Sequence, residues 1–118
     1  MENKEIYITN LQFYIESIDE LTELIRNNRP LSVDLKQKAQ QMLTEFKANL
    51  NNSLKDADKY GKNASVVDYD FNNYSSAIRD VSANMTIRTN SNPENWILEL
   101  NDARFSLTYG LGFIKKEK

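Results

Sequence analysis

The sequence predicts an all-α protein, an up-down antiparallel bundle of four helices in a single domain. Apolar residues recur every three or four positions in four successive segments, which places them on one side of each helix. The connections between these segments are short and contain proline, asparagine and glycine, which favour turns. The chain has 118 residues, of which 40 % are hydrophobic, an ordinary fraction for a domain with a buried core.

The first helix is expected at about residues 4–27. Its apolar stripe follows a regular helical spacing: Tyr7, Leu11, Tyr14, Ile18, Leu21 and Ile25. Carboxylates gather on the opposite side: Glu16, Asp19, Glu20 and Glu23. Ile6, Phe13 and Leu24 form a second, thinner stripe on the flank. A strand would scatter all three sets, so the pattern indicates an amphipathic helix.

The second helix is expected at about residues 33–60. Pro30 interrupts the chain before it, Ser32 is a suitable N-cap, and Asp34 complements the positive helix start. Gly61 is the expected left-handed C-cap. The apolar stripe contains eight residues: Leu35, Ala39, Met42, Phe46, Leu50, Leu54, Ala57 and Tyr60.

The third helix is expected at about residues 66–86. Its apolar stripe again has steps of three and four: Val67, Phe71, Tyr74, Ile78, Val81 and Met85. Many residues between them are serine, asparagine or aspartate, which favour caps and turns over helix interiors. The end of this helix is poorly defined, because the letters MTIRT at residues 85–89 also resemble a short strand.

The fourth helix is expected at about residues 93–109. Asn92 is a suitable cap and Pro93 suits the first helical position. One stripe then runs through the segment: Trp96, Leu100, Ala103, Leu107 and Leu111. A second pattern alternates strictly, as in a half-buried strand: Phe105, Leu107, Tyr109, Leu111 and Phe113. The alternative fold is therefore a helical hairpin followed by a β-hairpin within residues 91–114.

Two glycines, Gly110 and Gly112, are expected to end the fourth helix and leave a short tail at residues 110–118. The tail begins with apolar residues and ends with basic ones. The letters GLGF do not indicate a phosphate-binding loop, because they do not lie between a strand and a helix and no lysine with a serine or threonine follows them.

Composition narrows the classes of function. The formal net charge is −2, which gives no reason to expect nucleic-acid binding. The chain has neither cysteine nor histidine, so disulfides and the commonest general base and metal ligand are excluded. No signal peptide or stretch long enough to span a membrane is apparent, and we expect a soluble cytoplasmic protein. The abundance of asparagine, lysine, isoleucine and tyrosine is typical of AT-rich bacterial or phage genomes.

One stretch partly resembles a calcium-binding loop. Asp68, Asp70 and Asn72 match the first three ligand positions, but Asn73 replaces the glycine and Arg79 replaces the final glutamate. A dimetal site in the bundle would need inward carboxylates and histidines. We therefore expect no metal, cofactor or catalytic site, and no enzymatic activity.

The acidic side of the first helix remains as the candidate site. Glu16, Asp19, Glu20 and Glu23 have no lysine within their own block to neutralise them, and Phe13 lies at their edge. The sequence therefore suggests a protein-binding module of the inhibitor, immunity or regulator type, with a basic protein as partner. The alternatives are a homo-oligomeric assembly protein, the simplest form of which is a homodimer, and a bundle that binds a small molecule in an internal cavity.

Overall fold

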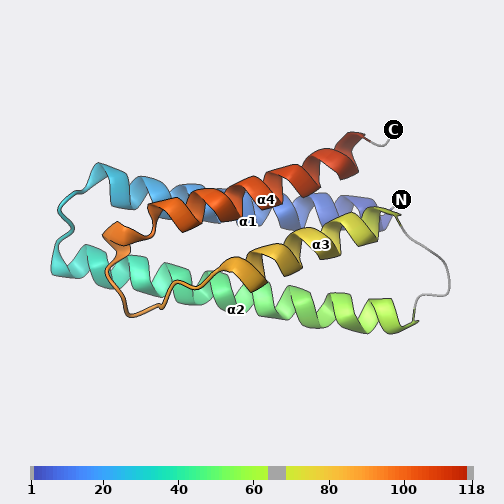
Figure 1. The fold of residues 1–118 in the computed structure, drawn as a ribbon, viewed down its shortest axis with the longest axis horizontal. Coiled ribbons are helices and arrows are strands. Elements are labelled where there is room, and N and C mark those ends of the chain that lie inside the picture. Colours follow the sequence, from blue (N-terminus) through green and yellow to red (C-terminus); the bar gives the residue numbers. More distant parts are fainter. Residues whose placement is uncertain (1, 64–68, 117–118) are drawn as a thin grey trace.

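The computed structural model describes residues 2–63 and 69–116, and all regular secondary structure in these ranges is helical. Four α-helices and a short 3-10 helix follow one another along the chain: α1 (Glu2–Asn27), α2 (Val33–Asn63), α3 (Tyr69–Asn84), η1 (Pro93–Asn95) and α4 (Ile97–Lys116). The α-helices run alternately in opposite directions, so the two chain ends lie at the same end of the bundle (Figure 1). The predicted all-α fold is confirmed, and the alternative with a C-terminal β-hairpin is wrong.

The predicted apolar stripes form most of the core. All six residues of the α1 stripe are buried, as are Ala39, Phe46, Leu50 and Ala57 of α2. Leu43 of α2 is fully buried too, although it lies beside the predicted stripe. The inner faces of α3 and α4 also contribute, as predicted, and so does Trp96, which lies between η1 and α4. The buried residues are Tyr74, Ile78, Val81, Trp96, Leu100, Ala103 and Leu107. The expected start of the third helix, with Val67, and the Tyr60 side chain lie outside the described part of the chain.

Glycines do not end α2 or α4, contrary to the prediction. Helix α2 continues through Gly61 to Asn63, and α4 continues through Gly110 and Gly112 to Lys116. The expected tail is therefore helical as far as Lys116. The physical reason in α4 is the burial of Ile114, which lies on the same side of the helix as Leu107 and adds core contacts beyond both glycines. Those contacts outweigh the intrinsic cost of about 1 kcal/mol for a glycine inside a helix.

Helix α3 ends at Asn84, two residues before the predicted end, and a non-helical segment at residues 85–92 follows it. Within this segment the Ser91 amide donates to the Arg88 carbonyl at 3.0 Å across a turn. Helix α2 has 31 residues and α3 has 16, which correspond to about 46 Å and about 24 Å. The connecting segment, residues 85–92, runs beside the part of α2 that α3 does not cover (Figure 1). Its Ile87 is buried, and the main chain accepts hydrogen bonds from two α2 side chains. Lys47 donates to the Ile87 carbonyl, and Gln40 donates to the Ser91 carbonyl at 3.0 Å.

The predicted caps are present, with one shift. Ser32 Oγ accepts a hydrogen bond from the Leu35 amide at 3.2 Å at the start of α2. Asn92 Oδ1 accepts one from the Glu94 amide at 3.2 Å, but it caps η1, and α4 begins only at Ile97. A Glu94 carboxylate oxygen also accepts from the Leu31 amide at 2.9 Å. This contact fixes η1 against the loop between α1 and α2.

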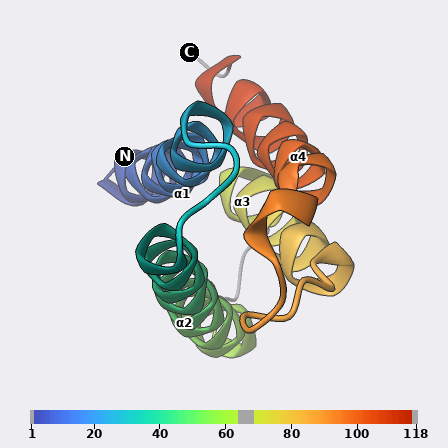
Figure 2. The ribbon, with the colours of Figure 1, turned by 90° about the vertical axis from the view of Figure 1, so that its left-hand side faces the viewer.

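The helices do not surround the core evenly. Helix α4 packs most extensively against α3 and α1, and α1 also touches α3. Within the described residues α2 and α4 do not pack against each other, and Figure 2 shows them at opposite corners of the bundle.

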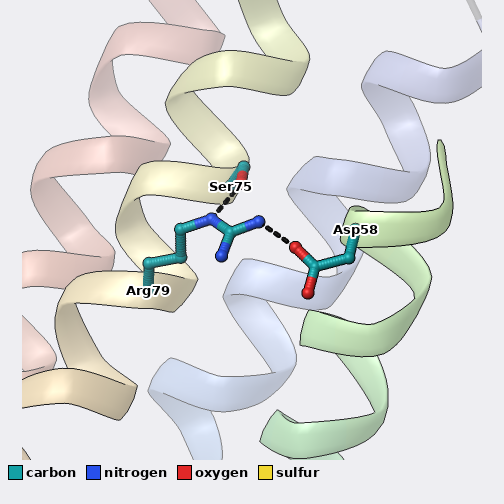
Figure 3. A network of polar contacts seen from close by, with 3 residues as sticks. All are labelled: Asp58, Ser75 and Arg79. Atoms are coloured by element: carbon teal, nitrogen blue, oxygen red, sulfur yellow. Dashed lines mark hydrogen bonds and ion pairs between the residues drawn. The ribbon is translucent and has the colours of Figure 1, made fainter. Parts of the chain in front are cut away.

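A polar link joins α2 to α3, where Arg79 forms an ion pair with Asp58 and donates to Ser75 Oγ at 3.1 Å (Figure 3). The molecule measures 50 × 26 × 20 Å.

Candidate functional site

The acidic face of α1 points to solvent. We use this name for Glu16, Glu20 and Glu23, which are all exposed on the side of α1 opposite its buried stripe. Three and four residues separate neighbours on a helix surface, so these carboxylates lie next to one another. Among the described residues, none of the three forms an ion pair. The face therefore presents to solvent three carboxylates that form no ion pair within the described part of the chain.

Asp19 does not belong to this open face, although the sequence grouped it with the other three. The Arg104 guanidinium of α4 donates to both Asp19 carboxylate oxygens, at 2.6 and 3.2 Å. These hydrogen bonds and the charge of Asp19 raise the pKa of Arg104. The sequence could not show this pairing, because the two residues are 85 positions apart. Asp19 thus joins α1 to α4, and its charge is compensated.

Phe13 lies at the edge of the acidic face, as predicted. Its side chain is 49 % exposed, and its ring contacts Tyr14 edge-on with the ring centres 5.5 Å apart. One edge of the ring is therefore held by the protein while the rest is open to solvent. An anchored aromatic beside charged residues is a common arrangement at protein interfaces.

A second exposed surface was missed at the sequence level. The outer face of α4 consists of Leu98, Phe105, Tyr109 and Phe113, of which Leu98, Phe105 and Tyr109 are 74, 70 and 62 % exposed. The three aromatic rings form a row, with Phe105 stacked on Tyr109 and Tyr109 edge-on to Phe113. The strict alternation of apolar residues from Phe105 to Phe113 was the sequence signal for this second exposed face. It arises because α4 is apolar on two opposite sides, with Leu107 directed inward and these rings outward.

Gly112 lies within this outer face and creates a shallow hollow. A Cβ atom added at Gly112 would have no neighbour within 4 Å, so nothing in the described fold requires a glycine there. Thr108, Tyr109 and Phe113 surround the hollow. An exposed glycine inside a helix lowers the stability of the protein. No packing contact in the described part of the chain explains the glycine at this position.

A cavity of about 190 Å³ lies between α1, α2 and α3. Its apolar part is formed by Ile6, Tyr7, Ala57 and Phe71, and its polar part by Asn10, Ser53, Asp56 and Tyr74. All eight belong to the end of the bundle that also carries the chain ends (Figure 1). The alternative of a small-molecule-binding bundle calls for an internal cavity with converging polar groups, whereas this space is partly open to solvent and Asp56 at its edge is exposed.

Tyr14 lies next to the polar part of the cavity. Its hydroxyl donates to the Asn49 carbonyl at 2.8 Å and shares a second hydrogen bond with Ser53. Burial raises the pKa of the Tyr14 phenol, and the charges of Tyr74 and Asp56 raise it further, while the bond to Ser53 lowers it. Tyr14 therefore acts as a neutral hydrogen-bonding group.

The described residues contain no cluster of three or more carboxylate side chains placed to hold a metal ion. Asp70 and Asn72, from the stretch that partly resembles a calcium-binding loop, lie in the first turn of α3. Arg79 forms an ion pair with Asp58 and a hydrogen bond with Ser75. Asp68 lies outside the described residues. None of the helices in these ranges combines the length and the apolar character needed to cross a bilayer.

Comparison with protein-family models, with curated proteins and with solved structures finds no match for this chain. A function must therefore be argued from the surfaces and the cavity themselves.

Proposed function

We propose that this protein is a non-enzymatic module of the inhibitor, immunity or regulator type that binds a basic partner protein through the acidic face of α1. The observation that carries the proposal is the position of Glu16, Glu20 and Glu23, which are adjacent, exposed and uncompensated among the described residues. Like charges at this spacing repel one another and weaken the helix slightly. A basic partner would relieve that repulsion and would be attracted from a distance.

The surroundings of the face support the same function. Phe13 offers an apolar contact at its edge, and the bond between Asp19 and Arg104 holds α1 against α4. The opposite side of α1 is buried in the core, so the backbone that carries the face is already ordered and binding would cost little backbone conformational entropy.

The test is affinity capture from lysate with the wild-type protein and two charge variants. The first variant reverses the face, with Glu16→Lys, Glu20→Lys and Glu23→Lys. The control reverses three exposed carboxylates on other helices, with Glu45→Lys, Asp80→Lys and Asp102→Lys. Both variants have a formal net charge of +4, because three reversals add six charges to −2. Only the location of the new charges differs between them.

We expect the wild-type protein and the control to capture the same basic protein, and the face variant to lose it. Circular dichroism must show equal helix content in all three. If both variants fail to capture the partner, then net charge matters and the location of the charges does not, which would contradict the proposal. Capture that survives in the face variant would contradict it as well.

A second candidate function, self-association, is favoured by the outer face of α4. That face is apolar, so it does not suit a partner selected by charge. Phe105 projects from it, and Gly112 forms a hollow seven residues, or about two helical turns, further along the same side. A two-fold axis between residues 108 and 109 would place Phe105 of each copy opposite Gly112 of the other. Such reciprocal contacts are the rule in two-fold dimers.

Sedimentation velocity tests this second candidate. A dimer at low micromolar concentration should dissociate when Phe105→Gln removes the projecting ring or Gly112→Leu fills the hollow. Tyr69→Gln is the matched control, because it removes an exposed ring from α3, outside the proposed interface. A wild-type monomer under these conditions would overturn the candidate.

A further inference from the structure

We propose that the cavity between α1, α2 and α3 binds a small organic monocation of the alkylammonium class. This inference goes beyond the proposed function and does not depend on it, because the cavity and the acidic face of α1 contain different residues. Three features carry it, namely the size of the cavity, its aromatic wall and its single charge.

Size limits the ligand to a small molecule. The volume of about 190 Å³ is the share of about six molecules of liquid water, at roughly 30 Å³ each. It is below the 300–1,000 Å³ usual for pockets that take drug-sized molecules. A compact head group with a short chain fills this space, which is partly open to solvent.

The wall of the cavity is aromatic on one side. Tyr7 stacks on Tyr74 with the ring centres 4.7 Å apart and an angle of 18° between the rings. Phe71 lies at 6.1 Å from Tyr7 and is tilted by 57°. Aromatic rings attract cations through the negative potential of their faces, and groups of rings that line one space are the usual receptors for alkylammonium ions.

The charge of the lining has the matching sign. Asp56 is the one charged side chain among the described residues that line the cavity. Its side chain is exposed to solvent and lies on α2 between Ser53 and Ala57, which line the same space. A single carboxylate favours a monocation and disfavours an anion of the same size.

Neutral polar groups complete the site. Asn10 donates its amide hydrogen to the Tyr74 hydroxyl at 3.1 Å, which fixes the side chain and leaves its amide oxygen as an acceptor. Ser53 is held by Tyr14 in the same way. A hard metal ion would need several oxygen ligands to replace its water shell, and a wall of aromatic rings cannot supply them. An organic cation, which is weakly hydrated, needs only rings and one carboxylate.

The experiment is an NMR titration of the ¹⁵N-labelled full chain with choline and, separately, with 3,3-dimethylbutan-1-ol. The two molecules have nearly the same shape, but only choline is charged. We expect saturable shifts of amide signals around Asn10, Ser53 and Phe71 with choline. The neutral alcohol should bind at least about tenfold more weakly, as one desolvated cation–aromatic contact predicts.

Three variants complete the design. Asp56→Asn should weaken choline binding about fivefold without changing the weak binding of the alcohol. Phe71→Leu should weaken choline binding as well, because it keeps an apolar wall but removes a ring. Glu45→Gln removes an exposed charge elsewhere on α2 and should have no effect. Each of three results would overturn the proposal: no saturable shifts, equal binding of choline and the alcohol, or equal choline affinities of Asp56→Asn and Glu45→Gln.

Discussion

Gly110 and Gly112 have different roles although they are two residues apart in α4. A Cβ atom at Gly110 would lie 2.7 Å from the Cβ of Ala77, so this glycine permits the close contact between α3 and α4. We expect Gly110→Ala to destabilise the protein by about 1–3 kcal/mol, because the helices must separate. Gly112→Ala should stabilise it by about 0.5–1 kcal/mol, because alanine favours the helix and meets nothing.

Urea unfolding of the two glycine variants measures this difference. Each variant is the control for the other, since both add one methyl group to the same helix. If both variants change the free energy of unfolding by the same amount and in the same direction, the α3–α4 contact does not depend on close packing at Gly110.

Tyr14 makes stability depend on pH in the alkaline range. Its folded-state pKa is raised by burial above the ordinary value of 10.0, so the folded protein retains this proton when the unfolded chain has lost it. The contribution of Tyr14 is therefore complete below about pH 10 and decreases as the pH rises through the folded-state pKa. The free energy of unfolding of Tyr14→Phe should decline less above pH 10 than that of the wild type. Parallel declines in both proteins would contradict this account.

At the residue scale, the sequence correctly predicted much of what lies on α1. Helical spacing alone placed Glu16 and Glu20 outside, and Phe13 at the edge of the acidic face. It could not reveal that Asp19 meets Arg104, because that contact depends on how α4 is rotated about its axis.

At the element scale, local signals located the start of α2 and the end of α1, but they missed the start of α4 by four residues and the ends of α3 and α4. Ser32 and Asn92 act as caps because their side chains bond to nearby amides, which the local sequence determines. The end of α4 depends on core contacts of Ile114, and these need the neighbouring helices. The end of α3 was ambiguous because β-branched residues at 85–89 favour extended backbone.

The connecting segment, residues 85–92, should contribute to stability as a packed element. Ile87 is buried against the core, so Ile87→Ala should cost about 2–4 kcal/mol in the free energy of unfolding. Its exposed neighbour provides the control, and Arg88→Ala should change stability by less than about 0.5 kcal/mol. Chemical denaturation compares the two. Similar small effects would mean that the segment is only loosely attached to α2 and the core.

At the scale of the whole molecule, the four-helix arrangement followed from four amphipathic stripes and short connections. Such a bundle places α2 and α4 at opposite corners, as observed, but the sequence did not predict that α1 also packs against α3 or that the connecting segment lies beside the part of α2 that the shorter α3 leaves uncovered. It also gave no sign of the cavity, which needs Tyr7, Asp56 and Phe71 from three different helices.

The proposed functions use separate parts of this architecture. The acidic face lies on the outside of α1, the apolar outer face belongs to α4, and the cavity opens between α1, α2 and α3. A variant that affects one of them should leave the others intact, since measured effects at distant sites are usually additive.

The association rate of the captured basic partner tests the central claim most directly. It should be measured by surface-based kinetics for the wild type, the face variant and the control variant, at low and at physiological salt. If the acidic face of α1 binds the partner, the face variant should associate at least about tenfold more slowly than the control variant, and added salt should reduce the difference. Equal rates for the two variants at both salt concentrations would show that Glu16, Glu20 and Glu23 are only the solvated side of a helix.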